Sequence, residues 1–257
     1  MAEPMHPSQL FDLTDRIACV TGASSGLGQH AASVLARAGA RVVGVARRAE
    51  ALEAWRDDLG PDRAAAIAAD LSDRDALGDV ARAIAAPFGA PDIVVHAAGL
   101  NTRQPADEVT QEGWDATLAI NLTAPFFLSQ ALVPAMRDRG WGRIVNFASL
   151  QSSRAFPGGI AYGTTKGGVT QLTRAMAEAW APHGITANAI GPGFFPTELT
   201  QAVFSDPDRA ARNAAQTCLG RNGTLADLDG PLLFLCSEAS SYVTGQLLMV
   251  DGGFTAK

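Results

Sequence analysis

The sequence predicts an α/β domain in which helices cover both faces of a parallel sheet. Short apolar runs alternate with helical patterns along the whole chain. These runs lack the alternation of polar and apolar residues that is typical of a strand with one solvent-exposed face. Both faces of the sheet are therefore expected to be buried. A chain of 257 residues with 47% hydrophobic content can bury the core of one such domain.

The expected elements follow one another as strand, helix, strand. Parallel strands need crossover connections, which helices provide. The expected strands are residues 17–21, 41–46, 64–68, 92–95, 143–147, 186–190 and 246–250. The expected helices are residues 28–38, a charged stretch ending near 59, and residues 73–86, 111–138, 160–182 and 225–237. This order indicates a doubly wound, Rossmann-type fold, whose ligands bind at the carboxyl ends of the strands.

Three segments depart from the simple alternation. Asn121 and Pro125 are expected to divide the helix at 111–138, with a kink at the proline. Residues 1–14 contain two prolines and are expected to form a flexible lead-in, so that residues 15–257 form a single domain. Residues 194–220 are rich in phenylalanine and then polar without a clear period, which predicts a mobile flap over a pocket.

Composition narrows the classes of partner. The net charge is −6 without a long run of one sign, which argues against a nucleic-acid or membrane footprint and favours a small-molecule ligand. The three cysteines are far apart, which favours buried thiols over a disulfide framework or a metal site. The amino terminus lacks the pattern of a signal peptide, and no stretch is expected to reach the length of a membrane span. We therefore expect a cytoplasmic protein.

The stretch from Ser149 to Lys166 holds the most informative side chains. Tyr162 and Lys166 lie four residues apart, so on a helix they emerge on one face, one turn apart. A nearby ammonium favours the phenolate and pulls the pKa of a tyrosine, ordinarily about 10, toward neutrality. Ser149 can add a hydroxyl. The spacing alone fits equally a buried tyrosine beside a solvated lysine.

Residues 21–28 read T-G-A-S-S-G-L-G and lie between an expected strand and an expected helix. Their glycines allow a tight turn and a close approach to a pyrophosphate, and the helix that follows offers unpaired N–H groups. The spacing differs from G-x-G-x-x-G, so the ordinary dinucleotide fingerprint fails here. A glycine-rich turn without a ligand is the alternative interpretation.

Taken together, these motifs resemble the short-chain dehydrogenase/reductase family, whose motifs are T-G-x-x-x-G-x-G and Y-x-x-x-K. The likeness covers nearly the whole chain and is nearest to gluconate 5-dehydrogenases, keto-sugar-acid reductases and 3-oxoacyl reductases. The resemblance implies an NAD(P)-dependent enzyme acting on CH–OH groups and a homotetramer. It also implies that the catalytic residues are Asn121 in A-I-N-L-T, Ser149 in N-F-A-S, Tyr162 and Lys166.

The resemblance further assigns contacts with a nicotinamide dinucleotide. Asp70 in A-A-D-L matches the aspartate that contacts the adenine, and Thr197 in P-G-x-x-x-T matches the residue that holds the carboxamide. One motif departs from the family, because N-N-A-G is here His96-Ala97-Ala98-Gly99. The cofactor-binding residues implied are Gly22, Ser24, Ser25, Gly26, Leu27, Gly28, Arg47, Asp70, Leu71, Ala97, Gly99, Tyr162, Lys166, Gly193, Phe195 and Thr197.

Cofactor choice is expected to follow from the residues that end the second strand. An acidic side chain there would bind a ribose 2′-hydroxyl, whereas a 2′-phosphate needs cations. The chain has Ala46-Arg47-Arg48 and no acid. Arg47 can fork onto a phosphate while Ser24 donates a hydroxyl, which favours NADP(H) over NAD(H). The alternative is that both arginines are solvated residues at a helix start.

The mechanism implied by the resemblance is hydride transfer between the nicotinamide and a ketone or secondary alcohol. In reduction Tyr162 would donate a proton to the carbonyl oxygen, Ser149 would bond the same oxygen, and Lys166 would lower the phenol pKa and hold the ribose. Asn121 would fix a water that relays protons to the lysine. His96 is expected to satisfy a backbone carbonyl rather than to bind a metal or act as a base.

The substrate has two interpretations. Phe156, Phe194, Phe195 and Phe204 suggest an apolar wall, which suits a 3-oxoacyl or cyclic ketone. The segment A-G-L-N-T-R-Q-P-A instead resembles a loop of the keto-sugar-acid reductases, which suits a sugar acid or polyol. By this second interpretation Arg103 meets a carboxylate, and Arg154 is the second candidate for that contact. The expected substrate residues are thus Arg103, Arg154 and, from the apolar wall, Phe194.

Two other classes of function fit the same fold. A nucleotide-sensing binding protein would have lost the tyrosine or the lysine, and both are present. An epimerase or dehydratase with a tightly held cofactor would be longer and have a separate substrate region.

Overall fold

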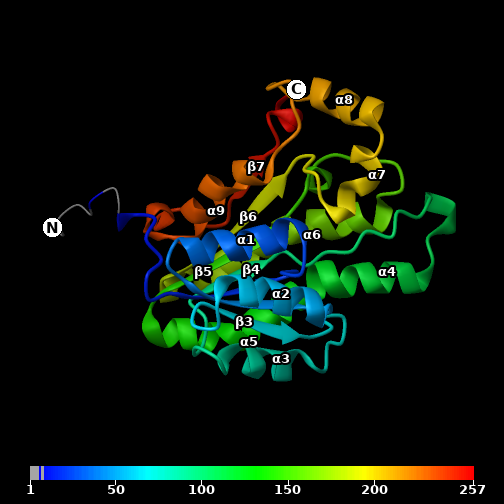
Figure 1. Cartoon of the computed structure of the whole chain (residues 1–257). Coiled ribbons are helices and arrows are strands. Elements are labelled where there is room, and N and C mark those ends of the chain that lie inside the picture. Colours follow the sequence, from blue (N-terminus) through cyan, green and yellow to red (C-terminus); the bar gives the residue numbers. More distant parts are fainter. Residues whose placement is uncertain (1–5, 7–8) are drawn as a thin grey trace.

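The computed structural model, which describes residue 6 and residues 9–257, contains seven parallel strands in one sheet (Figure 1). Their order across the sheet is β3-β2-β1-β4-β5-β6-β7. The strands are β1 (Ile17–Thr21), β2 (Arg41–Ala46), β3 (Ala64–Ala68), β4 (Ile93–His96), β5 (Gly142–Phe147), β6 (Ile185–Pro192) and β7 (Leu247–Val250). The predicted doubly wound class is confirmed.

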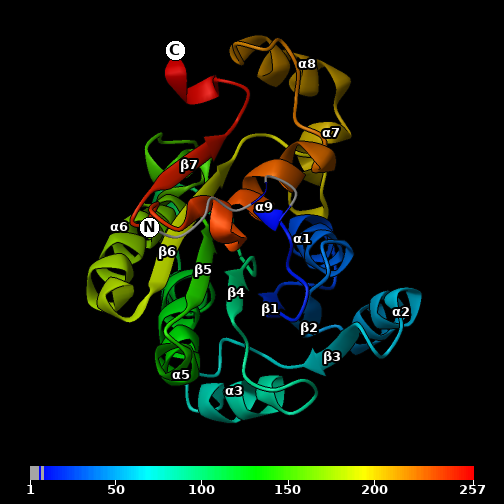
Figure 2. The same cartoon turned by 90° about the vertical axis from the view of Figure 1, so that its left-hand side faces the viewer.

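Helices cover the sheet on both faces (Figure 2). α1 (Gly26–Arg37), α2 (Ala49–Leu59) and α9 (Asp229–Cys236) share one core with the sheet. α3 (Leu77–Ala85), α5 (Ala124–Arg139) and α6 (Ile160–Trp180) share the other. The remaining helices are α4 (Gln111–Leu118), α7 (Gln201–Phe204) and α8 (Pro207–Gln216).

The two cores explain why the strands lack a polar alternation. In β1, Ala18 and Val20 enter the core under α1 and α9, and Cys19 between them enters the opposite core. Each of these side chains is fully buried. Successive side chains of a strand point to opposite faces, so a strand buried on both faces must be apolar at every position.

The sheet order creates the crevice in which a ligand of this fold binds. β1 pairs with β2 on one side and with β4 on the other. The chain therefore winds outward in opposite directions from this point, and the loops after β1 and β4 diverge. Such a switch point leaves a crevice at the carboxyl ends of the strands.

The long helical run from α4 to α5 contains a π-helical turn, η3 (Ala119–Thr123), instead of a break. This turn stands where Asn121 and Pro125 were expected to divide the helix. Pro125 lies in the first turn of α5, where its missing N–H is tolerated. The helical run therefore continues through the π-helical turn and Pro125 without a break.

The length of this helical run contradicts the expectation that no stretch of the chain would reach the length of a membrane span. Among the described residues, one helical run, Gln111–Arg139, is long and apolar enough to cross a membrane, and 44% of its window is buried in the protein. Core helices of soluble proteins pass the same test, so this is weak evidence for a membrane span.

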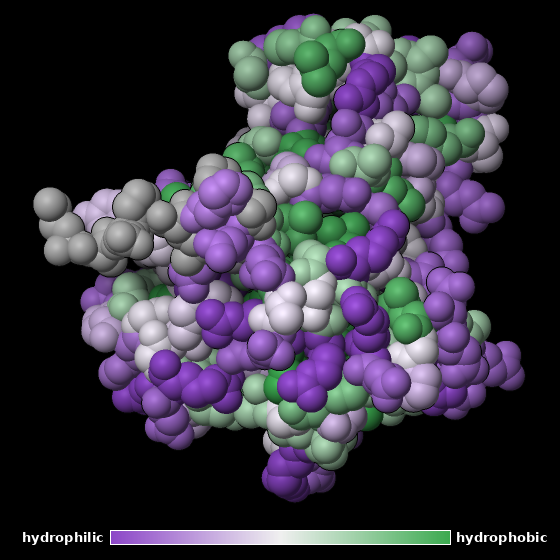
Figure 3. All heavy atoms as spheres, turned by 60° about the vertical axis from the view of Figure 1, so that its left-hand side comes forward, coloured by the Kyte–Doolittle hydropathy of each residue, from purple (hydrophilic) through white to green (hydrophobic). Residues whose placement is uncertain are grey.

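The predicted flap at 194–220 is largely helical. It contains α7 and α8, and Asp206 caps α8 by accepting a hydrogen bond from the Arg209 amide at 3.0 Å. In Figure 3 this segment stands at the top of the molecule, above a surface that mixes hydrophilic and hydrophobic side chains. The helices were missed because α7 is a single turn and the apolar face of α8 consists only of alanines, which give a weak signal in a polar segment.

The predicted lead-in falls partly outside the described residues, since residues 1–5 and 7–8 are not described. Within its described part, Leu13 is only 1% exposed and its amide donates to the Ala38 carbonyl. Packing against the domain therefore begins before residue 15.

Candidate active site

One large cavity, of about 960 Å³, opens at the carboxyl ends of the strands. Its walls come from the β1–α1 turn, the ends of β2 and β4, the segment after β5, helix α6 and the flap. Every residue predicted to bind the cofactor lies in its lining. Of the predicted catalytic residues, Ser149, Tyr162 and Lys166 line it, while Asn121 lies behind the wall.

The β1–α1 turn is shaped by its glycines. Gly22 has a φ of +74°, in the left-handed region, and a Cβ there would lie 2.8 Å from the Ala98 nitrogen. A Cβ on Gly28 would collide with the Gly22 carbonyl oxygen. The backbone of this turn therefore stays exposed to the cavity at the start of α1, as a pyrophosphate cradle requires.

The end of β2 presents two arginines to the same cavity. Arg48, the neighbour of the predicted phosphate ligand Arg47, bonds Ser24, through Nε to Oγ at 3.2 Å. Arg47 lies near Asp70, whose pKa is lowered by the Ser72 amide and hydroxyl and, to a smaller degree, by the Arg47 charge. The cationic groups required for a 2′-phosphate are thus present in the cavity.

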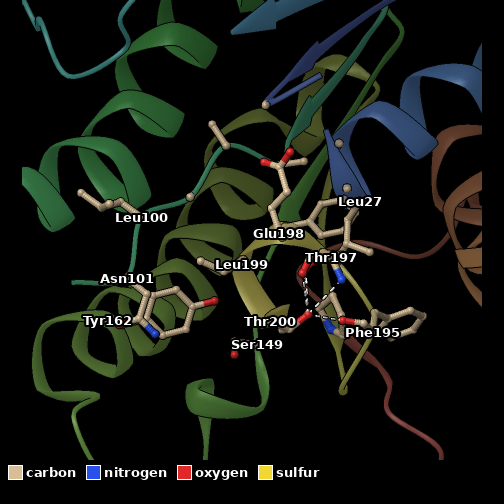
Figure 4. Close-up of a pocket in the computed structure, with 18 of the residues that line it drawn as sticks. Leu27, Leu100, Asn101, Ser149, Tyr162, Phe195, Thr197, Glu198, Leu199 and Thr200 are labelled. Atoms are coloured by element: carbon tan, nitrogen blue, oxygen red, sulfur yellow. Dashed lines mark hydrogen bonds between the residues drawn. The ribbon is translucent and has the colours of Figure 1, made fainter. Parts of the chain in front are cut away.

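Ser149 and Tyr162 meet at the other end of the cavity. Figure 4 shows their hydroxyl groups on the same side of the pocket. The pKa of Tyr162 is raised because burial opposes the phenolate, while the Ser149 hydroxyl and the Arg103 charge pull it down by less. The phenol is therefore neutral and able to donate a proton at neutral pH.

Lys166 lies on the same face of α6 as Tyr162, as the spacing predicted. Its Nζ is 5.5 Å from the centre of the Tyr162 ring and donates to the Phe147 carbonyl at 2.6 Å. The side chain is 4% exposed, and burial lowers its pKa to about 8. The expected lowering of the phenol pKa by this lysine is not found: the charge that lowers it is that of Arg103, and burial dominates both Tyr162 and Lys166.

Asn121 connects the π-helical turn to the loop after β4. Its Oδ1 accepts from the Leu100 amide at 2.8 Å, and its Nδ2 donates to the Leu100 carbonyl and to Thr165 at 2.9 and 3.0 Å. A Cβ on Gly99 would lie 3.6 Å from the same Oδ1. The side-chain amide is therefore fully used in holding this loop beside α6.

His96 makes a different contact from the one expected. Its Nε2 lies 2.8 Å from the Ser129 hydroxyl of α5, and the side chain is 3% exposed. Burial lowers its pKa to about 3, so it is neutral at physiological pH. The residue that replaces the family's asparagine thus joins β4 to α5.

The predicted substrate residues divide into two groups. Arg103 and Phe194 line the cavity, and the Arg103 guanidinium bonds the Leu199 carbonyl of the flap. Arg154 lies outside the lining, with its guanidinium bonded to the Lys257 carbonyl. Arg154 is therefore not placed to meet a ligand in this cavity.

Three of the four rings predicted to form an apolar wall line the cavity. Phe156 and Phe194 line the cavity and pack against Phe254 near the carboxyl terminus, with ring centres 6.2 and 5.7 Å away. Phe195 also lines it but is 2% exposed and packs on Gly223, and Phe204 lies outside the lining. Phe254 gave no signal of this contact because it is distant in sequence.

Comparisons with known proteins agree with this geometry. A family model described as enoyl-(acyl carrier protein) reductase matches residues 22–255. The gluconate 5-dehydrogenase of Gluconobacter oxydans (strain 621H) is 41% identical over 252 residues, which are 97% of this chain and 98% of that protein. The 3-oxoacyl-(acyl-carrier-protein) reductase of Vibrio cholerae serotype O1 is 35% identical over 243 residues, 95% and 98% of the two chains.

A solved structure completes the comparison. The gluconate 5-dehydrogenase of Burkholderia cenocepacia J2315, in complex with NADP and tartrate, has a TM-score of 0.92 at 36% identity, covering 98% of this chain and 100% of that one. The chain belongs to the short-chain dehydrogenase/reductase family. It is therefore an NAD(P)-dependent oxidoreductase that acts on alcohol and keto groups.

Several lining residues of this short-chain dehydrogenase/reductase escaped the sequence analysis. Most carry no motif and come from the flap or from loops whose position depends on the tertiary fold. Arg48 is the exception, since it adjoins Arg47, and only the direction of its side chain distinguishes the two. The residues missed include Arg48, Asn101, Gln151, Glu198, Arg209 and Asn213.

Proposed function

We propose that the protein is an NADP(H)-dependent enzyme that interconverts a ketone and a secondary alcohol, with Tyr162 as the proton donor and acceptor. The observation that supports this most directly is the content of one cavity. Ser149, Tyr162 and Lys166 stand at one end, and the glycine turn and two arginines stand at the other. A nicotinamide dinucleotide bound here would place its phosphates at the glycine turn and its nicotinamide beside Tyr162.

The cofactor-binding roles follow from the groups present. The exposed backbone of the β1–α1 turn would hold the pyrophosphate, Asp70 the adenine side, and Thr197 the carboxamide. Arg47, Arg48 and Ser24 offer a cationic and hydrogen-bonding site suited to a 2′-phosphate, which favours NADP(H) over NAD(H). When bound, the nicotinamide supplies or accepts the hydride.

The chain's own residues would manage the proton. In reduction, the neutral Tyr162 phenol donates to the carbonyl oxygen, and the Ser149 hydroxyl stabilises the charge that develops there. Lys166, buried with a lowered pKa, can hold the ribose and return a proton to the phenol. Asn121 would act by keeping the loop after β4 in place, and the proton-relaying water stays a prediction.

Replacing the phenol tests this function. Tyr162→Phe removes the hydroxyl but keeps the ring, so turnover should fall by about 10³-fold or more while NADPH affinity changes little. NADPH oxidation would be measured across a panel of keto-sugar acids, cyclic ketones and 3-oxoacyl thioesters, with affinity from calorimetry. Equal turnover by the variant would contradict the role of Tyr162. Wild-type binding of NADPH without turnover of any ketone would favour a nucleotide-sensing protein.

Within this reaction we propose a sugar acid or polyol as the substrate class. The wall near Tyr162 carries Arg103 and Asn101, and Arg209 and Asn213 of α8 line the same cavity. A polyhydroxylated carboxylate would satisfy these groups better than an acyl chain would.

Arg103→Ala should separate the substrate classes. Loss of the guanidinium is expected to raise KM for keto-sugar acids about 10- to 100-fold and to leave neutral cyclic ketones nearly unchanged. Arg154→Ala is the matched control, since Arg154 lies outside the cavity. If the wild type prefers 3-oxoacyl thioesters, the cluster of Phe156, Phe194 and Phe254 would instead carry specificity.

We also propose a cytoplasmic homotetramer in which α5 and α6 form an interface. An apolar groove between these helices supports the assembly, since Phe126, Phe127 and Leu172 line it and are only partly buried. Gly168 lets Leu122 lie over α6, because a Cβ there would be 3.2 Å from a Leu122 methyl group. A second copy of the chain would cover these side chains.

A further inference from the structure

The carboxylate of Glu198 bridges the two elements that are proposed to hold cofactor phosphates. Its Oε2 accepts from the Ser25 hydroxyl in the β1–α1 turn at 3.0 Å. Its two oxygens also pair with the Arg48 guanidinium, at 3.1 and 3.0 Å. Figure 4 shows the Glu198 side chain extending away from Tyr162 and toward the start of α1.

These partners are the groups that an incoming phosphate would use. Ser25 belongs to the glycine-rich turn, and Arg48 also donates to Ser24 across the same turn. A carboxylate and a phosphate are recognised by the same hydroxyl and guanidinium donors. The Arg48 and Ser25 contacts lower the pKa of Glu198, so it is ionised at neutral pH and competes as an anion.

The ion pair between Arg48 and Glu198 is not needed to compensate for buried charges. The side chains of Arg48 and Glu198 are 51% and 62% exposed, so neither charge needs the other as compensation for a dry environment. An exposed pair of this kind is weak and can open readily. Glu198 is therefore held near the phosphate site by contacts that a doubly charged ligand can displace.

We propose that Glu198 is an intramolecular competitor for the cofactor phosphate site, so that it sets the affinity for NADP(H) by occupying Arg48 and Ser25 in the cofactor-free protein. This inference rests on the proposed NADP(H) function. Binding then requires the carboxylate to leave. The apparent dissociation constant is the intrinsic one divided by the fraction of molecules in which Glu198 is released.

The position of Glu198 also connects the two ends of the cavity. It follows Thr197, which packs on the turn closely enough that a Cβ on Gly26 would lie 3.3 Å from the Thr197 Cβ. It precedes Leu199, whose carbonyl accepts from Arg103. Release of Glu198 therefore acts on the segment that touches both the phosphate turn and the proposed substrate arginine.

Direct binding tests the proposal without any turnover. Glu198→Gln keeps the shape of the side chain and removes its charge, and it is expected to lower the dissociation constant for NADP⁺ about three- to tenfold in calorimetry at low salt. Adenosine 2′,5′-bisphosphate should show the same gain, and 5′-AMP a smaller one. Glu178→Gln is the matched control, because Glu178 is exposed on α6 and outside the cavity.

A double-mutant cycle identifies the partner. Arg48→Ala should weaken NADP⁺ binding by itself, and adding Glu198→Gln to it should restore little, because the competition for Arg48 has gone. An unchanged or weaker NADP⁺ affinity in Glu198→Gln would overturn the inference. So would an equal gain in the Glu178→Gln control, which would point to net charge alone.

The two possible failures are distinguishable. If the wild type binds NADP⁺ and Glu198→Gln binds it no better, the competition is absent and the proposed cofactor stands. The NADP(H) proposal itself fails if the wild type, Glu198→Gln and Arg48→Ala each bind adenosine 2′,5′-bisphosphate no more tightly than 5′-AMP.

Discussion

Tyr162 shows how burial competes with local charge at a single residue. A lysine one turn away predicts a phenol with a lowered pKa, and the structure puts that lysine where expected. The pKa of Tyr162 is nevertheless raised, and that of Lys166 is lowered to about 8, because both side chains leave water. The spacing of residues in the sequence predicts which side chains share a helix face, but it does not predict how deeply that face is buried.

His96 leads to a prediction about stability at low pH. The pKa of His96 is about 3 in the folded protein against an ordinary value of 6.5 for histidine, so the unfolded chain binds the extra proton first. Stability from this residue is therefore present above pH 6.5 and is lost as the pH falls toward 3. At pH 5 the loss should be ~2 kcal/mol.

The variant that tests this is His96→Asn, which restores the amide typical of the family. Urea unfolding at pH 7 and pH 5 would give the loss of stability for each protein. The wild type should lose ~2 kcal/mol more than the variant over this interval. An equal loss in both would mean that His96 does not carry the acid sensitivity.

Among the elements, the strands were the most predictable. β1, β2 and β3 begin and end at the residues expected, because each is a short run of mainly apolar residues with polar residues or glycine close to its ends. The β1–α1 turn was equally readable, since only glycine fits at positions 22 and 28. Both signals are local, so they require no knowledge of the rest of the fold.

The elements that sequence reasoning missed lack such a signal. The π-helical turn at 119–123 differs from an α-helix in that its hydrogen bonds span one residue more, and no residue type specifies it. The apolar face of helix α8 consists of alanines alone in a polar segment, so its period is a weak signal. Both lie against the cavity or its lining, and their effect on the site depends on packing with distant segments.

At the scale of the whole molecule, the apolar groove between α5 and α6 predicts an assembly. Leu172→Arg places a charge among Phe126, Phe127 and Leu122, which a covering partner chain cannot solvate. Light scattering should give a mass of four chains for the wild type and a lower mass for the variant.

Glu53→Arg is the control for the tetramer, because Glu53 is exposed on α2, away from the groove. Its mass should match that of the wild type. A single-chain mass for the wild type protein would contradict the homotetramer and leave the groove without the proposed partner.

The sequence by itself determined the doubly wound fold, the phosphate turn and the Tyr162–Lys166 pair, because these depend on periodicity and on the steric freedom of glycine. Only the tertiary structure decided that Arg48 rather than Arg47 reaches Ser24, that Arg154 turns to the carboxyl terminus, and that Glu198 covers the phosphate turn. Each of these contacts joins residues far apart in the chain. Their side-chain directions follow from packing, which no local pattern of residues records.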